Sequence, residues 1–412
     1  MRASRAIASI PLAVIASFVT LGASRANVIT DWDERAIILL KSLPNYPAER
    51  IMGMVHCAMF DAVNSIEPRY RPYLVQLPVA PTTSKEAAAA AAAATVLATV
   101  DEKTAVETKG TLASFLAGIS DGAAKSDGIR LGEAVAAKVL EARANDGADA
   151  LDAYRPRTTP GVYVATPILA ASMWPNVKPF ALTKPDQFRP EPPVPLESME
   201  WATDFNETKD YGRKISDKRT AQQTETARFW LMTGPAAYHP FVRQLVLAKQ
   251  MSVLDSARFM ALVAIGLNDA YIAVFDAKYH YNFWRPITAI RNGDIDNNTA
   301  TEREAAWQPI DDTPMHPEYP CAHCIVSGTV VGIVKAALGS EDIPEIAIIS
   351  TRAPGVTHRW TNVATFSDEV ANARIWAGFH YRFSTRVGTR MGRAIGDFVV
   401  KSVMQPAQTS SR

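Results

Sequence analysis

The sequence predicts an all-α protein, a helical bundle with long connecting loops. Apolar residues recur at helical spacing in several long segments, whereas no pair of segments has the alternating pattern that strands require. The chain has 412 residues, of which 48% are hydrophobic and 21% charged. It can therefore bury a large core, in one large domain or two.

The N-terminus has the pattern of a secretory signal peptide. Arg2 and Arg5 form a positive region, an apolar stretch runs from Ala6 to Leu21, and Ser24 to Ala26 fits a cleavage site. A retained membrane anchor is the alternative, but Pro11 interrupts the apolar stretch, which is short for a span. We therefore expect residues 1–26 to be removed near Ala26. The mature protein would be secreted or periplasmic, with no later membrane span.

Helices are predicted on both sides of a long middle segment. In the first half we expect two helices within Trp32 to Ile66, divided by Pro44 and Pro47, one within Ser84 to Val100, and one or two within Thr111 to Ala144. Helices return within Trp201 to Trp230, Phe241 to Tyr279, Ile325 to Leu338, Ser367 to Gly378 and Arg386 to Val403.

The middle segment, Asp152 to Pro195, is rich in Pro, Gly and Thr but carries three large aromatic residues, Trp174, Phe180 and Phe188. Such anchors predict an ordered excursion over the surface rather than a flexible linker. We therefore expect an N-terminal helical region, residues 27–200, that packs on the core, and a second helical region, residues 201–405, that carries the candidate site.

Charge and cysteine content exclude several classes of protein. Lys+Arg is 43 and Asp+Glu is 42, so nothing indicates a nucleic-acid or polyanionic partner. The three cysteines do not form a disulfide framework. Cys321 and Cys324 could pair locally in an oxidising compartment, whereas Cys57 is expected to be a buried, small apolar residue. Whether the protein forms a homo-oligomer stays open.

Three segments carry residues that could hold an anion. Lys278 and Arg285 lie seven positions apart at the end of a long helical stretch, so both can lie on one helical face among aromatic neighbours. Buried cations there would need an anion or an acid to compensate them. A solvated basic face is the ordinary interpretation of such a pair alone.

The second segment is Pro320-Cys321-Ala322-His323, which ends a proline-rich run directly before an apolar helix. Free main-chain N–H groups and the positive end of the dipole make such a helix start favourable for an anion. The third segment runs from Arg374 to His380 and contains Gly378, which permits close backbone approach. A lone His or Cys at a helix start is usually structural, but Pro-Cys-Ala-His directly before a helix is more specific. The third segment by itself is weak evidence.

Together, the three segments resemble the signature of the type 2 phosphatidic acid phosphatase and vanadium haloperoxidase superfamily. That signature is Lys, six residues, Arg-Pro; then Pro-Ser-Gly-His; then Arg, five residues, His. Further stretches are similar to the soluble exported bacterial branch: Met54 to Ile66, Trp174 to Phe180, Phe188 to Pro190 and Arg219 to Trp230. The resemblance covers most of the mature chain and implies the helical bundle of that superfamily.

The resemblance implies an enzyme with vanadate as its cofactor, or phosphate in the same site. Lys278, Arg285 and Arg374 would bind the oxyanion, together with Cys321 and Ala322 at the helix start. His380 would bind vanadium and His323 would be the acid–base group. The substrates would be hydrogen peroxide and a halide. The alternative activity is an acid phosphatase that hydrolyses a phosphate ester through a phosphohistidine at His380.

Three departures from the family pattern affect this site. Cys321 stands for the family serine and is a weaker hydrogen-bond donor, and Ala322 stands for glycine and adds a methyl group. Ser384 stands where an acid often follows the second histidine, so we expect His380 to lack an orienting carboxylate and to be less basic. This favours vanadate over phosphatase chemistry.

Two residues indicate the halide pocket. His316 resembles a residue of the bromide-oxidising members, and Phe275 occupies another position near that pocket. We therefore favour bromide over chloride. The remaining histidines, His56, His239, His280 and His358, are expected to be structural or on the surface.

Three other functions stay open at this point. Cys321 and Cys324 at a helix start resemble a thiol–disulfide exchange motif, although no strand–helix–strand pattern flanks them. The same cysteines with histidines could bind zinc, but three cations would repel it. The third is an anion-binding protein without turnover, disabled by Cys321 and Ala322.

Overall fold

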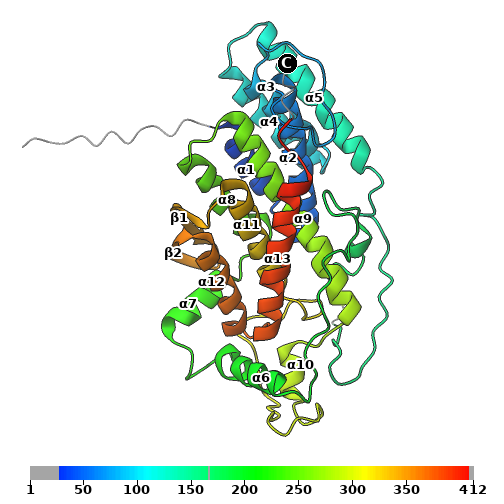
Figure 1. The fold of residues 1–412 in the computed structure, drawn as a ribbon, viewed down its shortest axis with the longest axis vertical. Helices are drawn as coiled ribbons and strands as arrows, with labels where there is room; N and C mark the ends of the chain where they lie inside the picture. The colour runs from blue at the N-terminus through cyan, green and yellow to red at the C-terminus, as the bar shows by residue number, and fades with distance from the viewer. Residues whose placement is uncertain (1–26, 166–167, 408–412) are drawn as a thin grey trace, which may run out of the picture.

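The computed structural model describes residues 27–165 and 168–407, so the predicted signal peptide lies outside the described residues. Within them the protein is mainly helical, as the sequence predicts. It has 13 α-helices, one short 3-10 helix and one two-stranded antiparallel sheet. The molecule is elongated, and α9 and α13 run along its length (Figure 1).

The first five helices are α1 (Val28–Leu39), α2 (Asn45–Ile66), α3 (Lys85–Leu97), α4 (Glu102–Ala117) and α5 (Ala123–Arg143). Both prolines expected to separate α1 from α2 lie at the start of α2: Pro44 is its N-cap, and Pro47 lies within its first turn. A proline there removes an N–H group that has no helical partner. The alanine-rich sequence of α3 is buried from Ala87 to Ala94.

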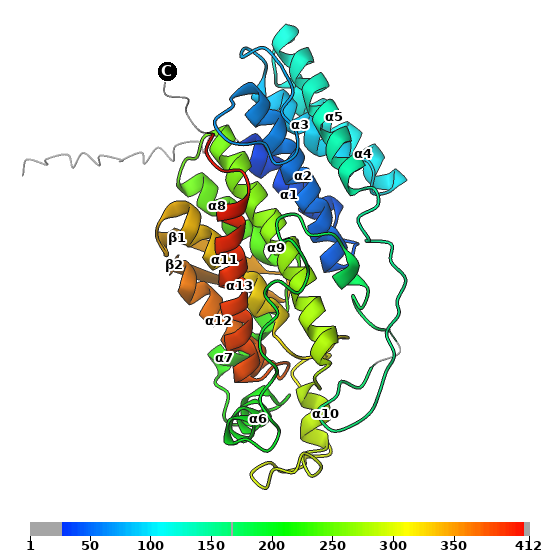
Figure 2. The same ribbon diagram turned by 45° about the vertical axis from the view of Figure 1, so that its right-hand side comes forward.

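The middle segment runs along the side of the molecule before the chain returns to the bundle, and it contains the 3-10 helix η1 (Trp174–Asn176) (Figure 2). As predicted, its aromatic residues pack against the core: Trp174 and Phe180 are buried, and Phe188 is half-buried. The boundary between the two regions near residue 200 stays a prediction, because one continuous apolar core includes residues from α1 to α13.

The second half contains α6 (Met199–Gly212), α7 (Ala221–Phe229), α8 (Pro235–Ala248), α9 (Val253–Tyr281), α10 (Pro286–Arg291), α11 (Ala322–Leu338), α12 (Val363–Trp376) and α13 (Arg382–Ser402). Helices α11 and α13 pack so closely that a Cβ atom at Gly392 would lie 2.1 Å from the carbonyl oxygen of Ile325. Only glycine permits this approach.

Two expectations about the elements are wrong. Helix α9 is long and apolar enough to cross a membrane, contrary to the expectation that no stretch after the signal is, but it is almost entirely buried as a core helix. The sequence analysis also missed a hairpin of β1 (Asp342–Ser350) and β2 (Ala353–Asn362). Pro344 and Pro354 lie in these strands and a register shift interrupts the pairing, which obscures the alternation.

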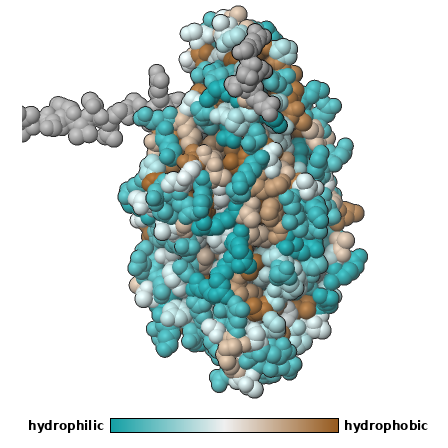
Figure 3. Space-filling model, in the orientation of Figure 1, coloured by the Kyte–Doolittle hydropathy of each residue, from teal (hydrophilic) through white to brown (hydrophobic). Residues whose placement is uncertain are grey.

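The surface seen in Figure 3 is mostly hydrophilic, with small apolar areas between the polar side chains. The candidate site lies inside the bundle, where the end of α9, the start of α11 and the end of α12 meet.

Candidate functional site

Lys278 lies in the last turn of α9 and is fully buried. Its Nζ atom donates to the carbonyl oxygens of Pro317 at 2.8 Å and Glu318 at 2.7 Å. An ammonium group has three N–H donors, so one is left for a further acceptor. Burial, followed by the charge of Arg285, lowers the pKa of Lys278 well below its usual value.

Arg285 reaches the same place by a different route from the one predicted. Helix α9 ends at Tyr281, Asn282 adopts the left-handed conformation with φ 51°, and Arg285 is the N-cap of α10. The prediction that Lys278 and Arg285 share one helical face is therefore wrong, because a turn separates them. The turn nevertheless brings both side chains to one site, since both contact the chain between residues 316 and 318.

The guanidinium of Arg285 is buried and holds two histidines. Its Nη1 donates to the carbonyl oxygen of Phe379 at 2.9 Å and to Nε2 of His380 at 3.3 Å, and its Nη2 donates to Nδ1 of His316 at 2.9 Å. Burial lowers the pKa of Arg285 to about 10. Since a guanidinium has only donors, Nε2 of His380 carries a lone pair, whereas Nδ1 of His316 also lies 3.1 Å from the carbonyl oxygen of Pro317.

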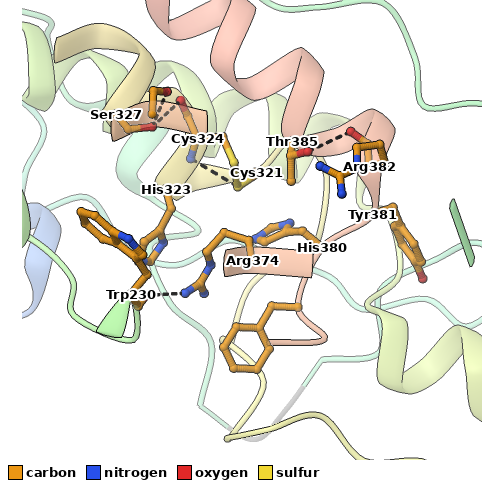
Figure 4. Close-up of a disulfide and its surroundings, with 12 residues drawn as sticks. Trp230, Cys321, His323, Cys324, Ser327, Arg374, His380, Tyr381, Arg382 and Thr385 are labelled. Carbon is orange, nitrogen blue, oxygen red and sulfur yellow. Dashed lines mark hydrogen bonds between the residues drawn. A yellow bond between two sulfur atoms is a disulfide. The ribbon is translucent and has the colours of Figure 1, made fainter. Parts of the chain in front are cut away.

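Helix α11 starts three residues before the predicted Ile325 and ends at Leu338, as predicted. Cys321 is the N-cap, and Ala322 is the first helical residue. Cys321 and Cys324 form a disulfide, and the Cys324 N–H group donates to the Cys321 sulfur at 3.3 Å (Figure 4). A disulfide sulfur carries no hydrogen, so Cys321 cannot donate to an anion as the family serine would. The disulfide also leaves no thiolate here for zinc, which excludes the predicted alternative.

Arg374 lies in the last turn of α12 and is buried beside His380 (Figure 4). Its Nη1 donates to the carbonyl oxygen of Trp230 at 2.7 Å, and its guanidinium lies 4.8 Å from the ring centroid of Phe379. Its buried Nε has no partner in the part of the chain that the structure describes. Burial lowers the pKa of Arg374 to about 9.

Gly378 allows the loop between α12 and α13 to turn toward the site. It has φ +78°, and a Cβ atom there would lie 2.5 Å from the carbonyl oxygen of Gly212. The predicted close backbone approach is confirmed. This loop places His380 one residue before the N-cap of α13.

Glu318 is the site residue that the sequence analysis missed. Its Oε1 atom accepts from Nδ1 of His380 at 2.7 Å and from the N–H group of Tyr381 at 3.3 Å. The expectation that His380 lacks an orienting carboxylate, drawn from Ser384, is therefore wrong. Burial raises the pKa of Glu318 to about 7, although Lys278 and Arg285 oppose this.

No local signal could have identified Glu318, because 62 positions separate it from His380. The only sequence feature that distinguishes Glu318 is that it is an acidic residue within the proline-rich run directly before Cys321. His380 is nevertheless weakly basic, as expected, for another reason. Burial, followed by the charges of Arg285 and Lys278, lowers its pKa well below the usual value.

A cavity of about 390 Å³ joins most of the predicted residues. It is lined by His316, Ala322, His323, Arg374, His380 and Phe275, with Tyr46 and Tyr271 on the apolar side. The rings of Phe275 and His316 meet edge to face, with centroids 5.4 Å apart. Lys278 and Arg285 lie directly behind this wall, through their contacts with residues 316–318.

His323 faces the cavity from the second helical position of α11. Its Nε2 donates to the carbonyl oxygen of Met232 at 3.0 Å, which leaves a lone pair on Nδ1. Burial, followed by the charge of Arg374, lowers its pKa well below the usual value. The residue is thus neutral and able to accept a proton.

The charges around the cavity fit a tetrahedral oxyanion. Three buried cations, Lys278, Arg285 and Arg374, meet one buried carboxylate, that of Glu318, within the described residues. The unpartnered Nε of Arg374 and the remaining N–H of Lys278 offer donors without acceptors. Guanidinium groups bind tetrahedral oxyanions well, and the start of α11 adds main-chain N–H groups.

A second buried cluster joins α1, α2 and α8 outside this cavity. Asp33 accepts from His56 at 2.9 Å and from His239 at 2.6 Å, while Arg243 donates to its other oxygen at 2.9 Å. His239 also bonds to Glu49 at 2.8 Å. With His239 protonated, two cations balance two carboxylates. Asp33, His56 and His239 also offer ligand atoms within 4.8 Å of one another, the spacing of a metal site, so the structural role expected for both histidines stays a prediction.

Fold and site together define a class: a helical-bundle protein with a buried cationic cage that is suited to a tetrahedral oxyanion. Residues 258–409 match the family model of the VCPO second helical-bundle domain. This part of the chain is therefore similar to that domain.

Among individual proteins, the vanadium chloroperoxidase of Curvularia inaequalis is 26% identical over 146 residues. That alignment covers 29% of this chain and 23% of that protein, so it spans about a quarter of the relative's length. A bacterial vanadium-dependent iodoperoxidase structure has a TM-score of 0.77 and 22% identity, covering 92% of this chain and 97% of that one.

The holo form of a bacterial vanadium-dependent chloroperoxidase has a TM-score of 0.68 and 17% identity, covering 87% of this chain and 91% of that one. The protein therefore has the vanadium haloperoxidase fold along nearly its whole described length.

Proposed function

We propose that the protein is a vanadate-dependent haloperoxidase that oxidises a halide with hydrogen peroxide. The observation that carries this proposal is the cage itself. The charges of three buried cations, Arg285, Lys278 and Arg374, act on His380, and the lone pair of its Nε2 faces Arg285, which donates to it. The match of residues 258–409 to the VCPO second helical-bundle domain supports the same conclusion.

The residues of the cage would each have a defined task. Lys278, Arg285 and Arg374 would hold the vanadate oxygens through N–H groups, and His380 would bind vanadium through Nε2. When bound, vanadate supplies a Lewis acid that activates hydrogen peroxide toward halide attack. Burial of these side chains strengthens each of these charge interactions.

His323 would move the proton. It lines the cavity, its Nε2 is held by the carbonyl of Met232, and its Nδ1 carries a lone pair. Incoming hydrogen peroxide has to lose a proton, and a neutral imidazole can take it. The lowered pKa of His323 keeps it neutral between turnovers.

We propose bromide as the preferred halide, ahead of chloride. His316 lines the cavity, and its Nδ1 lies 2.9 Å from Nη2 of Arg285 and 3.1 Å from the carbonyl oxygen of Pro317; the tautomer that accepts from Arg285 has its proton on Nε2, from which it can donate to an anion. Phe275 packs against the same ring and gives this side of the cavity an apolar wall, which suits a large, weakly hydrated halide.

The test is bromide oxidation by hydrogen peroxide with phosphate-free protein, with and without orthovanadate. A rate that depends on vanadate and disappears in His380→Ala is expected, with iodide, bromide and chloride compared in one series. Absence of any vanadate-dependent rate with all three halides would refute the proposal.

An acid phosphatase is the second candidate, and one observation favours it. Glu318 supplies His380 with the orienting carboxylate that Ser384 cannot, so the sequence argument against a phosphohistidine no longer holds. Hydrolysis of an aryl phosphate, inhibited by vanadate and without bromide oxidation, would select this activity.

We further propose that the protein is exported, on the pattern of residues 1–26. N-terminal sequencing of the mature protein from its natural source should then begin at Asn27. Recovery of a protein that retains Met1 would contradict this.

A further inference from the structure

His380 is bonded at both ring nitrogens, and the two partners have opposite chemistry. The carboxylate of Glu318 lies 2.7 Å from Nδ1, and the guanidinium of Arg285 lies 3.3 Å from Nε2. An ionised carboxylate can only accept, and a guanidinium can only donate. One neutral tautomer satisfies both partners, with the proton on Nδ1 and the lone pair on Nε2.

Glu318 is held in place for this contact. Its side chain is fully buried, Oε1 also accepts from the N–H group of Tyr381, and its own carbonyl oxygen accepts from Lys278 at 2.7 Å. The groups that face its carboxylate are His380, Tyr381, Ser384, Lys278 and Arg285. The carboxylate therefore has little freedom to move away from His380.

The charge of Glu318 would otherwise work against the site. A buried carboxylate in a cage built for an anion repels that anion, and an apolar residue there would leave three cations to attract it. A negative charge at this position is useful only if it does something that the cations cannot do. Fixing the lone pair of His380 is such a task.

We propose that Glu318 is a positioning residue that fixes the Nδ1–H tautomer of His380 and thereby makes the cage select vanadate over phosphate. The selection rests on the proposed function, because it takes His380 as the vanadium ligand. Vanadate can accept a bond from the Nε2 lone pair, whereas stably bound phosphate uses only the charges and N–H groups of the cage. A partner that orients a metal-binding histidine typically changes affinity by about 10- to 100-fold.

The first measurement is the affinity for vanadate and for inorganic phosphate, by calorimetric titration of wild type, Glu318→Gln and Glu318→Ala. We expect the ratio of vanadate to phosphate affinity to fall by about 10- to 100-fold in Glu318→Ala. The fall should be smaller in Glu318→Gln, whose amide oxygen can still accept from Nδ1. Phosphate binding should stay equal or become tighter, because a negative charge is lost.

Asp312→Asn is the matched control. Asp312 lines the same cavity and carries the same charge, and it is exposed rather than bonded to His380. Its removal should change the binding of both anions by a similar factor and leave the ratio unaltered. The selection of vanadate by Glu318 would be overturned by a ratio of vanadate to phosphate affinity that is unchanged in the Glu318 variants. A change of the same size in Asp312→Asn would overturn it as well.

The second measurement needs neither catalysis nor vanadate. Nitrogen-15 NMR of histidine-labelled protein reports which ring nitrogen is protonated, and the His380→Gln spectrum assigns the signal. Wild type should show His380 with Nδ1 protonated, and Glu318→Ala should shift it toward the Nε2–H form. The same tautomer in both proteins would overturn the positioning role even if the protein oxidises bromide. Conversely, an inactive protein with the predicted shift would refute only the proposed function.

Discussion

Arg374 is the cage residue whose removal tests anion binding most cleanly. It lies in α12, and its side chain makes a single hydrogen bond to the described residues, from Nη1 to the carbonyl oxygen of Trp230. Its buried Nε has no protein acceptor among the described residues. The Arg374→Ala variant should therefore lose affinity for the anion while keeping most of the stability of the fold.

The magnitude follows from the bonds that would be lost. A hydrogen bond to a charged group contributes about 1.5–3 kcal/mol, and about 1.4 kcal/mol corresponds to a factor of ten. Vanadate binding should weaken by about 10- to 150-fold. The free energy of unfolding should change by less than about 2 kcal/mol, since the lost bond to Trp230 and the contact with Phe379 are opposed by relief of cation repulsion.

Calorimetric titration with orthovanadate measures this effect directly, and chemical denaturation supplies the stability. Arg393→Ala is the control, because it removes the same charge from α13 at a place outside the cavity. There Nη1 of Arg393 lies 2.9 Å from a carboxylate oxygen of Glu341. Arg374→Lys keeps the charge but loses the planar fork of donors. Its vanadate affinity should therefore lie between those of Arg374→Ala and Arg393→Ala. Equal vanadate affinity in Arg374→Ala and Arg393→Ala would refute the assignment of the cage.

The other predictions concern the buried cluster of α1, α2 and α8 and the disulfide. Asp33→Asn should destabilise the protein by about 3–5 kcal/mol in chemical denaturation, since it leaves buried cations unpaired, whereas Asp31→Asn on the same helix should cost less than about 1 kcal/mol. The charges of Asp33 and Glu49 outweigh burial and raise the pKa of His239 from 6.5 to about 10. Its contribution to stability is thus complete below pH 6.5 and is lost as the pH rises through about 10. The melting temperature of wild type should fall over that interval, and a His239→Gln variant with the same slope would contradict this. Cys321→Ser restores a hydroxyl donor at the start of α11, so its vanadate affinity and activity should equal or exceed those of wild type, by up to about tenfold, and respond less to reductant. Cys324→Ser breaks the same disulfide without that hydroxyl, and lower activity in Cys321→Ser than in Cys324→Ser would argue against the donor.

Local sequence carried the parts of the site that depend on local geometry. A proline-rich run before an apolar stretch indicated that a helix starts near Cys321 to His323, and α11 begins at Ala322, three residues before the predicted Ile325. The glycine at position 378 indicated a close approach, which the contact with Gly212 confirms. Cations and histidines that lay far apart in the chain could be grouped only because their spacing resembled a known family.

The features that were predicted wrongly or missed depend on contacts between segments that are distant in the sequence. Periodicity placed Arg285 on the same helix as Lys278, whereas Asn282 ends α9 in the left-handed conformation; asparagine is a weaker signal for such an end than glycine. Glu318 was not predicted because its role depends on its hydrogen bond to His380. The loop after α12 brings His380 to it only in the folded protein. The Asp33 cluster likewise joins three helices through charges that pair only after folding.

The central claim is that this cage holds vanadate on His380. A crystal structure of the mature protein grown with orthovanadate tests it most directly. The account predicts vanadium bonded to Nε2 of His380, with oxygens that accept from Lys278, Arg285 and Arg374 and with the carboxylate of Glu318 still on Nδ1. Vanadate bound elsewhere, or held in the cage without a bond to His380, would contradict it.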